Sequence, residues 1–185
     1  SGMGLGGGTG AGIDRFITNK QIVFMGDSTF FHSGMAAVSD SIKHGQDITY
    51  VILDNKTTAM TGHQPTPGTD VDVMGSRTFA QDIERTVRGM AGSDGDTPVQ
   101  VIRMDPEARE AYRSVLEEAI LRDGVKVIVA EKECGITYHR RVKARQKEQV
   151  RERGYLAEET HINITPEACE YCLECTRATG CSGLT

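Results

Sequence analysis

Short apolar runs alternate with amphipathic segments along most of the chain. Each run is five or six residues long and is bounded by polar or glycine residues; the runs are Gln21–Met25, Ile48–Leu53, Val99–Met104 and Val125–Ala130. Such runs are typical of strands that are buried on both faces of a parallel sheet. Strands that alternate with helices predict an α/β fold, with an open, mostly parallel sheet and helices on both faces.

Three helices are expected between these strands, over 34–45, 78–90 and 105–122. The second should begin at a capping box formed by Thr78 and Gln81. The third should begin with Asp105 as its N-cap and Pro106 in its first turn. Six of the ten residues in 3–12 are glycine, which favours a flexible end, and 56–77 is predicted to be a long functional loop.

Composition narrows the class of protein. The chain has 185 residues, 38% of them hydrophobic, and a net charge of −5. This acidic balance argues against a general binder of nucleic acids or membrane surfaces. No apolar run approaches the roughly 20 residues of a membrane span, and the first residues do not resemble a signal peptide. We therefore expect a cytoplasmic protein.

Polar side chains follow two of the predicted strands. Gly26-Asp27-Ser28 ends the first strand, and Asp54-Asn55 ends the second. In an open parallel sheet, ligands bind beyond the carboxyl ends of the strands, so these side chains can reach one point. Carboxylate and amide oxygens suit Mg²⁺, which keeps substrate phosphates as partners, and glycines there let backbone amides approach the phosphates. The sequence predicts a site for a diphosphate and its metal.

Two longer strings carry a family resemblance. They are Gly26-Asp27-Ser28-Thr29-Phe30-Phe31-His32-Ser33-Gly34 and Asp54-Asn55-Lys56-Thr57-Thr58-Ala59-Met60-Thr61-Gly62-His63-Gln64-Pro65. Together they resemble the thiamine-diphosphate-binding domain of indolepyruvate:ferredoxin oxidoreductase, in the 2-oxoacid:ferredoxin oxidoreductase family. The resemblance extends over about 3–181, although GDS and DN stand where the general signature has GDG and NN.

The resemblance implies a role for each matched residue. Mg²⁺ would be held by Asp27, the Asn55 side chain and the Thr57 carbonyl. The cofactor would be lined by Gly26, Asp27, Ser28, Thr29, Asn55, Thr57, Thr58, Ala59, Met60 and Thr61. His32 and His63 would face the reacting region as catalytic residues, or serve as hydrogen-bonded residues of the loop. Phe30 and Phe31 would shape an aryl pocket or pack in the core.

The resemblance also implies that the active site is shared. The family's chemistry needs a carboxylate that activates the pyrimidine ring of the cofactor, and a separate pyrimidine-binding domain or subunit supplies it. This chain has no room for such a domain. We therefore expect a fragment or subunit of a hetero- or homo-oligomer, with the missing half on the same polypeptide or on a partner.

Four of the five cysteines lie close together near the end of the sequence. Cys169, Cys172 and Cys175 have the spacing that wraps a [4Fe–4S] cluster, and Cys181 would ligate the same cluster or another. Zinc is the alternative occupant. Cys134 is expected to be a structural thiol, and the basic stretch 139–153 a solvated helix, a linker or a docking surface for an acidic partner.

These observations divide the chain into three expected segments. They are an α/β domain that binds thiamine diphosphate and Mg²⁺ over 1–138, a basic linker or helix over 139–165, and an incomplete cysteine-rich iron–sulfur segment over 166–185. By resemblance, the enzyme would oxidatively decarboxylate an arylpyruvate to its acyl-coenzyme A and pass electrons to ferredoxin. The alternatives are a non-oxidative thiamine-dependent decarboxylase or lyase with a zinc tail, and a non-catalytic electron-transfer or assembly module.

Overall fold

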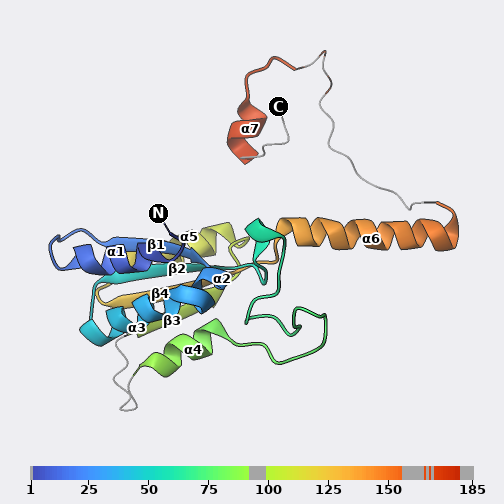
Figure 1. The fold of residues 1–185 in the computed structure, drawn as a ribbon. Coiled ribbons are helices and arrows are strands. Elements are labelled where there is room, and N and C mark those ends of the chain that lie inside the picture. Colours follow the sequence, from blue (N-terminus) through green and yellow to red (C-terminus); the bar gives the residue numbers. More distant parts are fainter. Residues whose placement is uncertain (1, 92–98, 156–164, 166, 168, 180–185) are drawn as a thin grey trace. The chain divides into compact units, whose positions relative to one another are not determined.

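The computed structural model describes the chain except for residues 1, 92–98, 156–164, 166, 168 and 180–185. Two compact units are present, residues 1–141 and 142–185. The first unit contains the sheet and most helices, and the second contains the larger part of a long helix and the cysteine-rich segment (Figure 1). In the described parts of the chain, no helix is both long enough and apolar enough to cross a membrane.

The first unit is built on a parallel sheet in the order β1-β2-β4-β3. Its strands are β1 (Gln21–Gly26), β2 (Ile48–Asp54), β3 (Val99–Met104) and β4 (Val125–Glu131). Because every pairing is parallel, the carboxyl ends of all four strands lie at one edge of the sheet. This confirms the predicted parallel α/β fold and the position of each strand.

Helices cover both faces of the sheet. The connections are α3 (Met35–His44), α4 (Ile83–Met90) and α5 (Arg109–Leu121). α3 and α4 belong to crossovers that run from β1 towards β3, whereas the crossover through α5 returns from β3 to β4. Right-handed crossovers in opposite directions place their helices on opposite faces. Buried residues of β1, β2 and β4, including Val23, Tyr50 and Val127, form the core beneath α3 and α4.

The glycine-rich start of the chain is a helix rather than a flexible end. α1 (Leu5–Asp14) packs against β1, β2 and α3. A Cβ atom on Gly7 would lie 2.7 Å from Cβ of Ala37, and one on Gly10 would lie 3.0 Å from side-chain carbons of Val23 and Ile48. The glycines let the helix approach the sheet closely, and this tertiary packing offsets their low intrinsic helix propensity.

Two neighbouring glycines of α1 provide a matched test of this packing. Gly7→Ala should destabilise the protein by about 1–3 kcal/mol, because its methyl group meets Ala37. Gly8→Ala should instead stabilise it by about 0.5–1 kcal/mol, because no atom beyond its chain neighbours and the helix's own backbone lies within 4 Å of the added carbon. Urea unfolding of both variants measures the difference. Equal effects of the two substitutions would contradict this account of α1.

The other helices begin at different residues from those predicted. The first starts at Asp27, seven residues early, and runs through α2 (Asp27–Thr29) and a π-helical turn (Phe30–Gly34) into α3. The predicted capping box at Thr78 is wrong, since the Asp82 side chain caps α4 by accepting from the Arg85 amide at 2.8 Å. Asp105 caps a turn through the Glu107 amide, and α5 begins only at Arg109.

The long segment between β2 and α4 contains a short 3₁₀ turn, Ala59–Thr61, and two isolated antiparallel bridges, Thr58 with Gln64 and Val71 with Arg77. Beyond β4, the basic stretch forms part of α6 (Gly135–Arg153). A further short helix, α7 (Glu174–Thr179), lies in the second unit. Because β1 and β2 are parallel neighbours, the loops that follow their carboxyl ends can build a site together.

Candidate functional site

Asp27 occupies the end of β1, where the strand turns into helix. Its side chain is almost fully buried, with 2% of the residue exposed. One carboxylate oxygen, Oδ1, accepts a 2.8 Å hydrogen bond from the Ser28 amide. The other, Oδ2, is buried and has no hydrogen-bond partner among the described residues. Burial raises the pKa of Asp27, and the nearby Asp54 carboxylate raises it further.

Asp54 occupies the equivalent position at the end of β2. Gly26 pairs with Leu53 in the sheet, so the two aspartates follow neighbouring positions of adjacent strands. Asp54 is 1% exposed. Its Oδ2 accepts a 2.6 Å hydrogen bond from Lys56 Nζ, whereas its Oδ1 has no hydrogen-bond partner in the described part of the chain. Two neighbouring buried carboxylates, each with an unsatisfied oxygen, are unfavourable unless a cation or a proton satisfies them.

The following loop supplies further oxygen atoms at this edge. The half-buried Asn55 accepts a 3.1 Å hydrogen bond from the Thr57 amide through Oδ1. Thr58 Oγ1 donates to Ser28 Oγ at 3.0 Å, which joins the loop after β2 to the residues after β1. The set offers carboxylate, amide, hydroxyl and carbonyl oxygens around unsatisfied buried carboxylates. This is the donor chemistry of Mg²⁺, so the residues fit the predicted metal.

A metal held there would depend on amide and backbone oxygens as well as carboxylates. Within the ranges that the structure describes, no three His, Cys, Asp or Glu residues are grouped so that they could hold a metal ion. Mg²⁺ bound by a few protein oxygens keeps its remaining coordination sites for water and phosphate. A metal at this position would therefore need water or phosphate oxygens to complete its coordination.

The rest of the loop folds back on itself. Backbone hydrogen bonds join the Thr58 amide to the Gln64 carbonyl and the His63 amide to the Thr58 carbonyl, at 2.9 and 3.0 Å. Gly62 and His63 adopt positive φ angles of 121° and 63°, which is unusual for histidine. His63 Nδ1 is buried without a hydrogen-bond partner among the described residues, whereas the Met60 side chain is exposed.

The predicted aromatic and histidine residues after β1 separate into two environments. Phe30 and Phe31 are buried in the core and pack edge to face with their ring centroids 5.3 Å apart. Of the two possibilities for these rings, the structure shows core packing. His32, in the same π-helical turn, is exposed. π-Helical turns occur often at functional sites, and this one leaves Asp27 and Ser28 at the start of the helical run.

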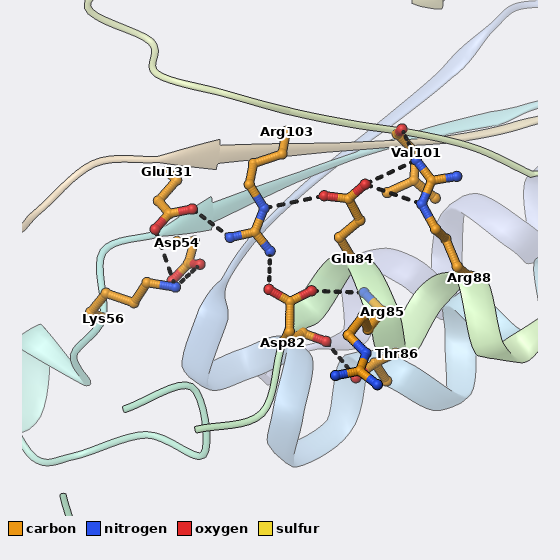
Figure 2. A network of polar contacts seen from close by, with 10 residues as sticks. All are labelled: Asp54, Lys56, Asp82, Glu84, Arg85, Thr86, Arg88, Val101, Arg103 and Glu131. Atoms are coloured by element: carbon orange, nitrogen blue, oxygen red, sulfur yellow. Dashed lines mark hydrogen bonds and ion pairs between the residues drawn. The ribbon is translucent and has the colours of Figure 1, made fainter. Parts of the chain in front are cut away.

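An ion-pair network that the sequence did not reveal lies beside this site (Figure 2). Arg103, near the end of β3, contacts three carboxylates: Asp82, Glu84 and Glu131. Glu131 also lies 3.5 Å from Lys56, whose ammonium group contacts Asp54. Charged residues at the ends of two strands were the available signal, but only the strand order β2-β4-β3 shows that they meet.

The cysteines occupy exposed or half-buried positions. Cys172 and Cys175 are exposed and Cys169 is half-buried, while Cys181 lies outside the described residues. The half-buried Cys134 precedes α6. Hydrogen bonds from the Thr137 amide lower the pKa of its thiol, as expected for a cysteine at a helix N-terminus.

Comparison with known proteins identifies the domain. Residues 1–130 match the family described as thiamine pyrophosphate enzyme, C-terminal TPP binding domain. This chain belongs to that family. The strand-end site described above therefore lies within a TPP-binding domain, TPP being thiamine diphosphate.

Curated relatives show which thiamine-dependent proteins this chain is similar to. The TPP-binding chain is 36% identical over 182 residues to indolepyruvate oxidoreductase subunit IorA of Archaeoglobus fulgidus, covering 98% of this chain and 26% of that protein. It is 30% identical over 182 residues to the same-named subunit of Methanothermobacter thermautotrophicus, with the same two coverages. The chain thus spans about a quarter of the length of these relatives. They confirm the resemblance predicted from the two sequence strings.

Among solved structures, the domain is similar to 2-oxoglutarate:ferredoxin oxidoreductase from Magnetococcus marinus. The TM-score is 0.61 at 16% identity, over 71% of this chain and 46% of that one. At this identity the likeness shows a shared fold. The predicted thiamine-diphosphate-binding fold is confirmed for the α/β part of the chain.

Proposed function

We propose that the chain is part of a subunit of a thiamine-diphosphate-dependent 2-oxoacid:ferredoxin oxidoreductase. Its substrate would be an arylpyruvate such as indolepyruvate, its product the acyl-coenzyme A, and its electron acceptor ferredoxin. The observation that carries this proposal is the pair of buried carboxylates, Asp27 and Asp54, with unsatisfied oxygens inside the matched domain. The names of the curated relatives support the choice of substrate class.

In this proposal, each group of site residues has a distinct task. Asp27, the Asn55 side chain and the Thr57 carbonyl hold Mg²⁺, which neutralises the diphosphate. Gly26, Ser28, Thr29 and the loop residues Thr58, Ala59, Met60 and Thr61 line the cofactor. His32 and His63 orient the substrate's carboxylate and carbonyl as hydrogen-bond donors. When bound, thiamine diphosphate supplies the carbanion-stabilising chemistry of decarboxylation.

The proposed site needs a second component. The carboxylate that activates the cofactor's pyrimidine ring would come from a separate pyrimidine-binding domain or subunit. Co-purification of the chain with such a component tests this part of the proposal. Coenzyme-A-dependent reduction of ferredoxin by indolepyruvate in the assembled complex tests the activity, and its absence with every arylpyruvate would exclude the proposed reaction.

The cysteine-rich segment provides a chemical test of the redox step. If Cys169, Cys172, Cys175 and Cys181 hold a [4Fe–4S] cluster, anaerobically purified protein should contain about four irons and four acid-labile sulfides per chain. Elemental analysis and sulfide assay measure both. Stoichiometric zinc without sulfide would remove the electron path and favour the non-oxidative decarboxylase with a zinc tail.

A further inference from the structure

We propose that Arg103 is a positioning residue for the candidate cofactor site. It would act through the ion-pair network of Figure 2, which fastens both ends of the loop 55–82 to the sheet. This loop carries Asn55, Thr57 and Thr58. The effect of Arg103 on cofactor binding rests on the proposed function, whereas its effect on the order of the loop does not.

The first end of the loop is held beside β2 and β4. Lys56 Nζ lies 2.6 Å from Asp54 Oδ2 and 3.5 Å from Glu131 Oε1. Asp54 and Glu131 are register partners in the sheet, so both carboxylates stand on rigid strands. The Lys56 backbone has a φ of 60°, a left-handed conformation that a non-glycine residue keeps only when surrounding contacts hold it. This conformation turns the chain into Thr57 and Thr58.

The second end of the loop is held where α4 begins. Asp82 caps α4 through the Arg85 amide and also contacts the Arg103 guanidinium. Glu84, in the first turn of α4, lies 3.3 Å from Arg103 Nε. Arg103 therefore fixes the residue at which the loop ends and the helix starts. Partial burial opposes the charged form of Arg103, but the hydrogen bond that Arg103 donates to Glu131 and the charge of Asp82 outweigh it and raise the pKa of Arg103.

Within the ion-pair network, Arg103 is the residue that links the two ends of the loop 55–82. Its Nη1 contacts Glu131 Oε2 at 2.5 Å, and Glu131 in turn contacts Lys56. The planar guanidinium presents donors in three directions at once, which a lysine ammonium on a flexible stem cannot reproduce. Without Arg103, the carboxylates of Asp82, Glu84 and Glu131 would face one another with fewer cations among them. The loop would then lose its second attachment and part of the charge balance beside Lys56.

Hydrogen–deuterium exchange of the 185-residue chain tests loop order without any cofactor. In Arg103→Gln, amides in 56–81 should exchange about tenfold faster, while amides of α5 and of β1 and β2 exchange as in the wild type. Arg103→Lys should fall between the two. Arg113→Gln is the matched control, because it breaks an exposed arginine–glutamate pair within α5, in which Arg113 Nε lies 2.8 Å from Glu117 Oε1.

Calorimetric titration with thiamine diphosphate and Mg²⁺ tests the consequence for binding. Arg103→Gln should weaken affinity about 10- to 100-fold, as is usual when the support of a metal ligand is lost, and Arg113→Gln should leave it unchanged. Unchanged loop exchange in Arg103→Gln, or faster exchange throughout the chain, would overturn the positioning role. If the wild-type chain, assembled with the pyrimidine-binding component, bound no thiamine diphosphate, the proposed function would fail, and the exchange result would still decide whether Arg103 orders the loop.

Discussion

Asp27→Ala is expected to abolish Mg²⁺-dependent binding of thiamine diphosphate without unfolding the protein. The substitution removes the only acidic side chain at the end of β1, including the buried oxygen that no described residue satisfies. If Asp27 is the metal ligand that we propose, its loss should weaken binding by roughly a hundredfold or more, exceeding the usual loss for a supporting residue. Calorimetric titration of wild type and variant, each assembled with the pyrimidine-binding component, measures the change.

The metal-free stability of Asp27→Asn provides the control. Asparagine keeps the size of the side chain but removes a buried charge whose pKa is raised by desolvation, so the variant should be at least as stable as wild type in EDTA at neutral pH. Mg²⁺ and thiamine diphosphate should then raise the unfolding temperature of the wild type only. If Asp27→Asn bound the cofactor as tightly as wild type, the metal assignment would be wrong.

The sheet and the location of the site could be predicted because local signals agreed with the tertiary fold. Each strand is a short apolar run between polar residues, and all four were found at the predicted positions. The polar residues after β1 and β2 come together because parallel neighbours share a carboxyl edge, which needs no side-chain detail. Two strings of sequence were sufficient to indicate the family.

Prediction failed where tertiary packing overrides local preference. Four glycines in 6–10 indicate a flexible end, yet α1 forms because close approach to Val23, Ala37 and Ile48 requires residues without a Cβ atom. At the start of α4, Thr78 and Asp82 are both acceptable N-caps by residue type. Asp82 is used because Arg103, distant in sequence, contacts the same carboxylate.

The ion-pair network could not be predicted for a related reason. Lys56, Asp82, Arg103 and Glu131 come from four separate segments, and no spacing rule links them. Their meeting depends on β4 lying between β2 and β3, a strand order that right-handed crossovers allow but do not require. The sequence thus indicated the proposed ligands of the site but not the ion pairs that lie beside them.

Another ion pair, between Lys126 and Asp47, should have a large effect on stability. It lies at the amino ends of the strands, away from the candidate site. Lys126, at the start of β4, is 1% exposed. Its ammonium group lies 2.7 Å from Asp47 Oδ1 and donates to the Arg122 carbonyl at 2.8 Å. Asp47→Asn would leave this buried cation without a negative partner. Because Asp47 itself is partly exposed, we expect a loss of about 2 kcal/mol, below the range for fully buried pairs.

The stability lost in Asp47→Asn should depend on pH in a defined direction. Partial burial favours the protonated form of Asp47, but hydrogen bonds from Lys126 and Lys20 outweigh it and lower its pKa below the ordinary value of 3.8. The folded state thus binds its proton more weakly than the unfolded state. The stabilisation is present above pH about 4 and is lost as pH falls through the folded pKa. The gap between wild type and Asp47→Asn in urea unfolding should therefore narrow in acid.

Two further variants separate this ion pair from simpler explanations. Asp123→Asn removes the exposed partner of Lys20 and should change stability by less than about 0.5 kcal/mol. Adding Lys126→Met to Asp47→Asn removes the unpaired buried charge and should recover most of the lost stability. Because the pair lies at the amino ends of β2 and β4, none of these variants should alter thiamine diphosphate affinity. A double variant as unstable as Asp47→Asn alone would show that the loss does not come from the buried lysine.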